Sequence, residues 1–433
     1  MPHPLPGRRE IEAHQLEELR SLLVELIPAN PFYTRKLQGS GVTFDVASLQ
    51  DYTARFPFTT KPELAEDQRH HPPFGANLTY PLDRYTRFHQ TSGTHGAPLR
   101  WLDTPESWEW LVDNWTEVFR AVDVGPNDRV FFAFSFGPFL GFWLAFESAT
   151  RLGCLCIPGG GLSSTSRLRA LMSNGATVLC CTPTYAIHLA EVATEEKVDL
   201  GACRVKKIIV AGEPGGSIFT TRARIESLWT GARVFDHHGM TEVGPVTYEC
   251  PAQPGVLHVI ESAYIAEVID PASGKPAPAG QAGELVLTTL GRTGSPLLRY
   301  RTGDLVKFRT RNAERGTACR CGRHELALEG GILGRSDDMV IVRGVNVYPT
   351  AVEEIIRSFE DVAEYRVHIT QEDAMTEMRV EVESTAQCAD PPALAARVEK
   401  AFESALVLRV PVSAVPPGAL PRFEMKAKRW IKT

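Results

Sequence analysis

The sequence predicts an α/β protein. We expect a large N-terminal domain of helix-covered, mostly parallel sheets with a β-rich subdomain, and a small C-terminal α+β domain after a hinge. Strand-like and helix-like segments alternate with short links between residues 130 and 211, which is typical of a parallel sheet covered by helices. Near residue 255 the pattern changes to short strands and turns, which indicates the β-rich subdomain. The chain has 433 residues, too many for one hydrophobic core, so two or three domains are expected.

Apolar spacing locates the elements of the N-terminal domain. Residues 10–28 place leucine and isoleucine at helical spacing, and residues 107–122 have the same period. Continuous apolar runs predict buried strands at residues 130–134, 154–158, 176–181 and 207–211. Helices are predicted between them at residues 139–152, 166–172 and 185–193. Short strands of the β-rich subdomain are predicted at residues 266–269 and 283–287.

The C-terminal part is predicted to form a separate unit after the polar stretch at residues 334–338. Its predicted elements are a helix that begins at Pro349, strands at residues 366–369 and 378–382, and a helix at residues 392–406. We therefore expect an N-terminal domain over residues 1–335 and a mobile C-terminal domain over residues 336–433.

Composition and charge exclude several classes of protein. The formal net charge of −6 argues against a nucleic-acid-binding protein. No apolar run reaches the length of a membrane span, and the N-terminus does not resemble a secretory signal. A cytoplasmic enzyme is therefore expected, with neither nucleic acid nor membrane as a partner. Its nine cysteines are expected to be thiols or metal ligands rather than a disulfide framework.

A hydroxyl-rich loop at residues 91–98 follows a strand-like segment and contains two glycines and three hydroxyl residues. Such a loop can offer backbone N–H groups and hydroxyls to a phosphate, because glycine lets the backbone curl around an anion. Ser/Thr/Gly clusters are also the common composition of surface turns, so the loop alone does not establish a nucleotide site.

Four further polar motifs lie downstream, at residues 236–242, 300–304, 334–338 and 420–426. Each of them alone is also typical of an ordinary turn, linker or solvated basic tail. Together with the hydroxyl-rich loop, in this order and spacing, they resemble the adenylate-forming superfamily of acyl- and aryl-CoA ligases, adenylation domains and luciferases. The similarity is greatest to the phenylacetate-CoA ligase branch, through residues 56–61, 319–323, 334–339 and 343–349. The resemblance runs from about Phe32 to Arg429.

The resemblance implies an ATP- and Mg²⁺-dependent ligase. The first step would join a carboxylic acid to AMP, and the second would pass the acyl group to coenzyme A. An enzyme that delivers the acyl group to an amine or a carrier protein, and a nucleotide-binding module without catalysis, are the alternatives. The sequence leaves open which acid is used and whether two copies pair as a homodimer.

The resemblance also implies roles for single residues. Thr241 would contact the α-phosphate, Glu242 would hold Mg²⁺, Lys426 would be the catalytic lysine, and Asp337 would be the hinge. The implied nucleotide-binding residues are Thr91, Ser92, Gly93, Thr94, His95, Gly96, Gly212, Glu213, Pro214, Asp236, His237, His238, Gly239, Asp304 and Arg335.

The chemistry explains these residue types. A carboxylate is a poor nucleophile towards an anionic phosphate, so both groups must be held in line while a metal and a fixed cation offset the growing charge. Lysine supplies a compact point charge for that purpose. His95 among the hydroxyls of the loop departs from the family pattern, and three further positions do so too. His238 stands where a tyrosine is usual, Met425 stands where a glycine precedes the lysine, and Leu99 stands where many members carry a lysine.

Two further clusters complete the prediction. Cys250, His258, Cys319 and Cys321 offer three thiolates and an imidazole, the ligand set of a tetrahedral structural Zn²⁺ site, and relatives in the branch have Cys/His at matching places. The other cysteines in strand-like runs, at 154, 156, 180 and 181, are assigned to the core. Ser135, Phe136 and Gly137 after a strand, with Tyr185, are assigned to the acyl pocket and suggest an aromatic or arylacetic acid.

Overall fold

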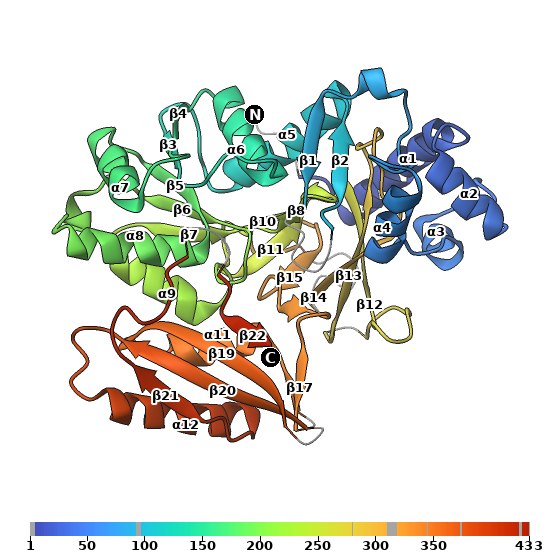
Figure 1. Ribbon diagram of the computed structural model, residues 1–433. Coiled ribbons are helices and arrows are strands. Elements are labelled where there is room, and N and C mark those ends of the chain that lie inside the picture. Colours follow the sequence, from blue (N-terminus) through green and yellow to red (C-terminus); the bar gives the residue numbers. More distant parts are fainter. Residues whose placement is uncertain are drawn as a thin grey trace. The chain divides into compact units, whose positions relative to one another are not determined.

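The computed structural model describes residues 5–91, 97–278, 280–309, 318–343, 345–372, 375–423 and 427–432 (Figure 1). Contacts divide the chain into two compact units. The first unit comprises Met1–Gly160 and Asp236–Ile332, and the second comprises Gly161–Phe235 and Leu333–Thr433. The division after residue 335 that the sequence predicts stays a prediction, and each unit is described by itself below.

Four helices open the first unit. Their bounds are α1 (Arg8–Leu26), α2 (Pro31–Gly39), α3 (Leu49–Arg55) and α4 (Lys61–His70), followed by the 3₁₀ turn η1 (Leu82–Arg84). The start of α4 is fixed by a capping box, in which the Thr60 hydroxyl accepts from the Glu63 amide and the Glu63 carboxylate accepts from the Thr60 amide. This cap places Lys61 in the first turn of α4. The helix predicted over residues 10–28 is confirmed as α1.

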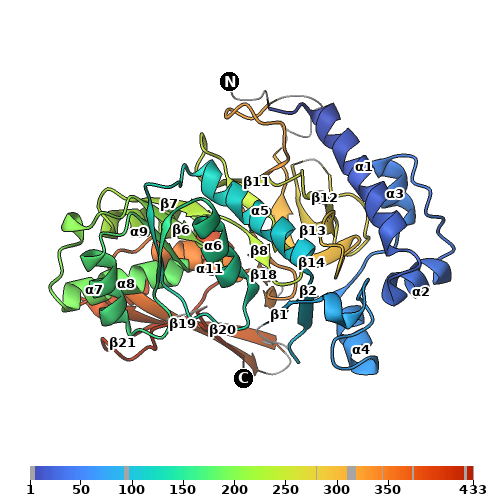
Figure 2. The ribbon, with the colours of Figure 1, turned by 90° about the horizontal axis from the view of Figure 1, so that it is seen from above.

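The next part of the first unit combines strands with two helices. The elements are β1 (Arg87–Gln90), β2 (Arg100–Asp103), α5 (Pro105–Ala121), β3 (Arg129–Phe132), α6 (Leu140–Arg151) and β4 (Leu155–Pro158). Strands β1 and β2 are antiparallel, whereas β3 and β4 are parallel. Helices α5 and α6 lie side by side (Figure 2). One side of α5 is apolar and buried, as the 3.6-residue period predicts.

The β-rich subdomain predicted from the change of pattern is confirmed. Its strands are β8 (Gly239–Met240), β9 (Gly244–Pro245), β10 (Thr247–Glu249), β11 (Val256–Val259), β12 (Tyr264–Ile269), β13 (Ala282–Thr289), β14 (Tyr300–Lys307) and β15 (Ala327–Glu329). Antiparallel pairing joins β10, β11 and β15 in one sheet and β12, β13 and β14 in another. Strands β8 and β9 form a short hairpin that carries the predicted phosphate and metal contacts.

The first stretch of the second unit alternates helices and strands, as predicted. Its elements are α7 (Ser164–Ser173), β5 (Val178–Cys181), α8 (Pro183–Glu195), η2 (Leu200–Ala202), β6 (Lys207–Val210), α9 (Phe219–Leu228) and β7 (Arg233–Asp236). Strands β5 and β6 are parallel, with Val178 opposite Lys207, and all four residues of β5 are buried. Helix α8 packs against both α7 and α9.

The C-terminal stretch of the second unit has its own core. Its elements are β16 (Gly334–Arg335), β17 (Val340–Val342), β18 (Val345–Val347), α11 (Pro349–Arg357), β19 (Val362–Glu372), β20 (Met375–Ser384), α12 (Pro391–Leu406), β21 (Val412–Val415) and β22 (Trp430–Lys432). The sheet order is β21-β20-β19-β22, with α12 packed against β20 and β21. Figure 1 shows this sheet in orange and red. Apolar residues of both helices and of the sheet form one cluster, so the predicted α+β unit is confirmed.

One strand differs from its prediction. The run at residues 154–158 was expected to be buried, but it forms β4 at the edge of its sheet, where Leu155 is 58% exposed. A continuous apolar run cannot distinguish a central strand from an edge strand. Cys154, Cys180 and Cys181 are buried as expected, whereas Cys156 is half-buried. Among the described residues, no helix is both long enough and apolar enough to cross a membrane.

Candidate active site and metal cluster

The hairpin of β8 and β9 holds Thr241 and Glu242 in the turn between its strands, here called the Thr241–Glu242 turn. The two strands approach so closely that a Cβ atom at Gly239 would lie 2.8 Å from the Gly244 carbonyl oxygen. Gly244 has a φ of +90°, in the region that favours glycine. The Tyr264 hydroxyl donates to the Val243 carbonyl at 2.7 Å. Glycine therefore permits this hairpin, and a buried tyrosine fixes its end.

The side chains of His238 and Asp304 lie next to each other in the first unit. The His238 Nε2 atom lies 3.2 Å from Asp304 Oδ2, and both side chains are largely shielded from water. The His238 amide donates to the Thr247 hydroxyl at 2.8 Å, and its carbonyl accepts from the Val246 amide. Asp304 lies on β14, so the fold brings together two predicted nucleotide-binding residues from distant strands.

Glu242 lies close to a cation. The Lys61 Nζ atom at the start of α4 is 3.1 Å from Glu242 Oε1, and the Tyr300 hydroxyl donates to the same oxygen at 3.4 Å. The Glu242 residue is 5% exposed, whereas the Lys61 side chain is 51% exposed. Carboxylate oxygen is a ligand that Mg²⁺ prefers, but in this structure Lys61 occupies one oxygen of Glu242, so the predicted role of Glu242 in binding Mg²⁺ stays a prediction.

His237, the residue before His238, is buried. Its ring meets Trp115 edge to face, with the ring centroids 4.2 Å apart. Burial lowers the pKa of His237 to about 3, and the neighbouring His238 contributes to the decrease. The imidazole is therefore neutral at ordinary pH. Asp236, two residues before His238, donates its amide to the Glu249 carboxylate at 2.6 Å.

The hydroxyl-rich loop is described only at its ends. The Thr91 amide donates to the Leu99 carbonyl at 2.9 Å, and the Leu99 amide donates to the Thr91 hydroxyl at 3.0 Å. These two bonds close the base of the loop. The predicted phosphate contacts Ser92, Gly93, Thr94, His95 and Gly96, and the predicted catalytic Lys426, lie outside the described residues.

The second unit carries the predicted residues Gly212, Glu213 and Pro214 after β6. Gly212 has a φ of +93°, which favours glycine. The Glu213 carboxylate accepts from the Thr184 amide, in the first turn of α8, at 2.9 Å, and from the Ala427 amide at 2.9 Å. Glu213 therefore anchors the chain next to the predicted catalytic lysine. Its predicted contact with adenine stays a prediction.

Arg335 and Asp337 contact each other in the second unit. Arg335 donates from Nε and Nη2 to the two carboxylate oxygens of Asp337, at 2.8 and 2.9 Å. The predicted nucleotide contact and the predicted hinge residue are thus joined by a two-fold hydrogen bond. Tyr185, a predicted acyl-pocket residue, is fully buried, and its hydroxyl contacts Arg167 at 2.8 Å and Ser164 at 3.0 Å.

The other predicted acyl-pocket residues, Ser135, Phe136 and Gly137, follow β3 in the first unit. Phe136 contacts the rings of Trp143 and Phe146 edge to face, with centroids 5.1 and 5.6 Å apart. The Trp143 indole N–H donates to the Gly137 carbonyl at 2.9 Å. Aromatic side chains therefore line the chain at this strand end.

The four predicted zinc ligands converge in the first unit. One ligand atom from each of Cys250, His258, Cys319 and Cys321 lies within 4.8 Å of the others. The Cys250 and Cys319 sulfurs are 3.7 Å apart, and Cys321 Sγ is 3.4 Å from His258 Nε2. The Cys319 amide donates to the Arg323 carbonyl, and the Gly322 amide to the Cys319 carbonyl, which makes a tight turn. Ligands 69 residues apart in sequence thus meet at one point.

Three partners of the site were not among the residues predicted from the sequence. Lys61 and Tyr300 lie within the quoted motifs, but no role was assigned to either. The third is a buried Asp103–Arg292 pair, whose arginine contacts the carbonyls of the Thr241–Glu242 turn. No motif contains Asp103 or Arg292, so the sequence offers no signal for this pair.

Comparison with known proteins identifies the family. Residues 87–291 match the family described as "AMP-binding enzyme", and residues 344–433 match "AMP-binding enzyme C-terminal domain". Phenylacetate-coenzyme A ligase of Thermus thermophilus is 31% identical to the chain over 438 residues, which cover 96% of this chain and 95% of the relative. The chain belongs to the adenylate-forming enzymes, in the phenylacetate-CoA ligase-like branch.

Other members of the branch are similar over comparable lengths. Phenylacetate-coenzyme A ligase of Escherichia coli K12 is 30% identical, and the alignment covers 97% of this chain and 94% of the relative. The crystal structure of 2-hydroxyisobutyryl-CoA ligase with R3-HIB-AMP, in the postadenylation state, matches at a TM-score of 0.92 and 30% identity, over 99% of this chain and 91% of that one. This adenylate-forming enzyme therefore shares its whole fold with a CoA ligase.

Proposed function

We propose that this enzyme activates a carboxylic acid with ATP and transfers the acyl group to coenzyme A. The observation that carries the proposal is similarity of about 30% identity along nearly the full chain to phenylacetate-CoA ligases. A related 2-hydroxyisobutyryl-CoA ligase, 31% identical and matching at a TM-score of 0.73, has been crystallised with 2-HIB-AMP and CoA. Both partial reactions are thus represented among the relatives.

The site geometry supports the first half-reaction. A carboxylate oxygen of the acid attacks the α-phosphorus of ATP, the bond to the bridging oxygen breaks, and acyl-AMP and pyrophosphate are formed. Thr241 is proposed to contact the α-phosphate. Asp304, which lies next to His238, is proposed to bind the ribose hydroxyls. Glu242 is proposed to hold Mg²⁺, which would supply charge neutralisation at the phosphates. Lys426 is proposed to add a fixed positive charge between the two reacting anions.

In the second half-reaction the CoA thiol attacks the acyl carbonyl. The bond from the carbonyl carbon to the AMP oxygen breaks, AMP leaves, and the thiol proton is released to solvent. We place the hinge between the domains at Asp337 and propose that its pair with Arg335 opens when the domains rearrange. Two different arrangements of one site are required, because the attacking group changes from a carboxylate to a thiol.

A single-turnover experiment tests the acceptor. Enzyme is allowed to form acyl-AMP in the absence of CoA, and CoA, hydroxylamine or a phosphopantetheinyl carrier protein is then added. Rapid consumption with CoA and release of one AMP per acyl-CoA are expected. If CoA leaves the acyl-AMP untouched while the amine or the carrier protein consumes it, the acceptor proposed above is wrong.

The aromatic side chains after β3 favour an aromatic or arylacetic acid. Phe136 is half-buried among other rings, and a planar substrate can pack against it edge to face. Because one relative acts on 2-hydroxyisobutyrate, a screen by pyrophosphate release should include this aliphatic acid beside phenylacetate and benzoate.

The Phe136→Ala variant tests the acyl pocket. We expect the KM for the best aromatic acid to rise about 10-fold, because the ring contact is lost. Acetate, which is too small to reach the ring, serves as the internal control and should be used with an unchanged, weak efficiency. Equal losses with both acids would show that Phe136 stabilises the fold instead of selecting the substrate.

Cys250, His258, Cys319 and Cys321 are proposed to bind a structural Zn²⁺ ion. A tetrahedral site with Zn–S bonds of about 2.3 Å requires sulfurs about 3.8 Å apart, close to the 3.7 Å between Cys250 and Cys319. The set has four protein ligands and so leaves no open position for catalysis. When bound, the ion would cross-link the residue that follows β10, strand β11 and the Cys319–Cys321 turn.

Metal analysis tests the zinc site. The purified chain is expected to hold about one zinc per chain, and Cys319→Ser is expected to lose it and to melt several degrees lower. Cys388→Ser is the matched control, because Cys388 packs against the C-terminal core outside the cluster. Equal zinc content in both variants would contradict the site.

A further inference from the structure

A buried salt bridge lies beneath the Thr241–Glu242 turn. Arg292 donates from Nε and Nη2 to the two carboxylate oxygens of Asp103, at 2.6 and 2.7 Å. Both side chains are 0% exposed. The guanidinium of Arg292 keeps the pKa of Asp103 low despite its burial, which alone would raise it. The carboxylate of Asp103 is therefore stabilised in its charged form by its contact with Arg292.

The third nitrogen of the Arg292 guanidinium, Nη1, is directed to the Thr241–Glu242 turn. Its Nη1 atom donates to the carbonyl oxygens of both Thr241 and Glu242, at 2.9 Å each. One guanidinium thus links the Asp103 carboxylate to the two residues proposed to contact the α-phosphate and the metal. The central carbon of the guanidinium also lies over the Trp101 ring, 5.2 Å from its centroid, so the ring contacts the arginine head group.

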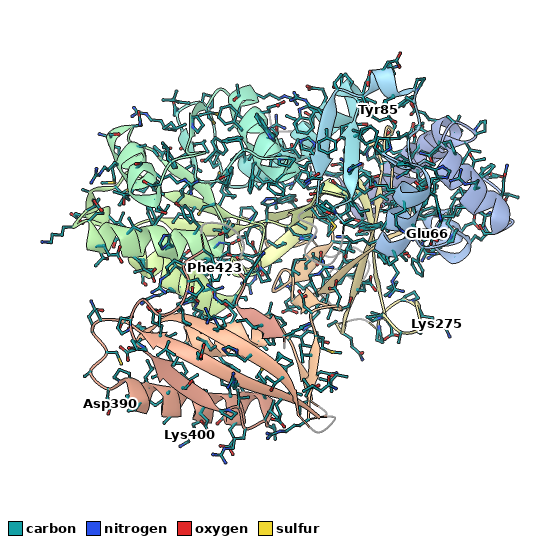
Figure 3. The ribbon with its side chains drawn as sticks, viewed as in Figure 1. Glu66, Tyr85, Lys275, Asp390, Lys400 and Phe423 are labelled. Carbon is teal, nitrogen blue, oxygen red and sulfur yellow. The ribbon has the colours of Figure 1, made fainter. Side chains whose placement is uncertain are left out.

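The segment that carries Arg292 is itself fixed by several contacts. A Cβ atom at Gly291 would lie 2.3 Å from the Trp110 ring, so only glycine fits there. The Tyr85 hydroxyl, labelled in Figure 3, donates to the Gly294 carbonyl at 2.6 Å, and the Gly294 amide donates to the Ser107 hydroxyl at 3.1 Å. The Ser295 hydroxyl donates to the Leu102 carbonyl at 2.7 Å, next to Asp103. The backbone before and after Arg292 is therefore held in place by these contacts.

We propose that Arg292, oriented by Asp103, is a positioning residue for adenylation that fixes the position and orientation of the Thr241–Glu242 turn. This inference rests on the proposed function, because it concerns the half-reaction in which Thr241 and Glu242 act. The geometry makes lysine a poor substitute, since one ammonium cannot reach both carboxylate oxygens and both carbonyls in a fixed plane. Displacement of a reacting group by about 1 Å can cost about 100-fold in rate.

The test compares Arg292→Lys with a charge-neutral double variant, Asp103→Leu/Arg292→Met. The double variant removes both buried charges together, which is better tolerated than removal of one partner. Arg8→Lys is the matched control, because Arg8 makes a two-fold hydrogen bond to the buried Glu261 and does not contact the turn. The measurements are acid-dependent exchange of pyrophosphate into ATP, its Mg²⁺ dependence, and the melting temperature.

We expect both Arg292 variants to melt cooperatively, to lose about 100-fold in the maximal exchange rate, and to need more Mg²⁺, with the KM for the acid unchanged. Arg8→Lys should exchange at the wild-type rate. A folded Arg292 variant with wild-type rate and Mg²⁺ dependence would overturn the inference, and so would failure of both variants to fold, since the pair would then support the whole unit. Absence of exchange in the wild-type enzyme would overturn the proposed function instead.

Discussion

Replacement of Lys426 by alanine is expected to lower the rate of adenylation by about two to three orders of magnitude while ATP still binds. The lysine belongs to the last of the five motifs, and we propose that it is the fixed cation that the chemistry requires between a carboxylate and an α-phosphate. Its flanking segment is held by Glu213, which accepts from the Ala427 amide, and by Arg429, which pairs with the buried Glu364. The measurements are acid-dependent pyrophosphate exchange and ATP binding by calorimetry.

Lys428→Ala provides the control for this experiment. Lys428 carries the same charge two residues further along the chain and is exposed. A general loss of positive charge in the tail would affect both variants equally, whereas a specific role affects Lys426→Ala alone. Full exchange activity in Lys426→Ala would remove the catalytic role from this residue. A second readout is conversion of preformed acyl-AMP with CoA, which should be much less affected because it does not involve attack on phosphorus.

The Glu242→Gln substitution is expected to reduce adenylation about 100-fold at ordinary Mg²⁺ concentrations and to be partly rescued by excess Mg²⁺. The substitution keeps the shape of the side chain and removes its charge. Glu242 is nearly buried, beside Lys61 at 3.1 Å, so the neutral amide weakens attraction for a divalent cation without creating a cavity. Steady-state exchange over a range of Mg²⁺ concentrations measures both effects.

Glu106→Gln is a suitable control for this variant. Its carboxylate lies on the exposed side of α5, where it pairs with Arg84. It should exchange like the wild type at every Mg²⁺ concentration. A Glu242→Gln enzyme with the wild-type Mg²⁺ requirement would show that another group holds the metal.

The sequence predicted most of the fold because its elements are local. Helix α1, the alternation from β3 to β6, and the C-terminal α+β unit follow from apolar spacing, caps and turns, which nearby residues determine. The edge position of β4 did not follow from its apolar run, since the neighbours of a strand are set by the topology of the whole sheet.

In the candidate site, too, some residues could be predicted from the sequence and others could not. Motif residues such as Glu242 and Asp304, and the zinc quartet, could be selected by residue type and order. The partners of the Glu213 carboxylate, which are two backbone amides, could be identified only from the tertiary structure. The contact between Lys61 and Glu242 could also be identified only from the tertiary structure, although both residues lie in the family motifs of the sequence.

By itself, the sequence determined the family, the order of the elements and the residue types that can bind a nucleotide and a metal. Only the tertiary structure decided what supports them. Asp103 and Arg292 are 189 residues apart and belong to no motif, yet their buried pair holds the carbonyls of Thr241 and Glu242. The physical reason is that burial makes a charged group require a partner of opposite charge, and folding alone determines which residue is close enough to be that partner.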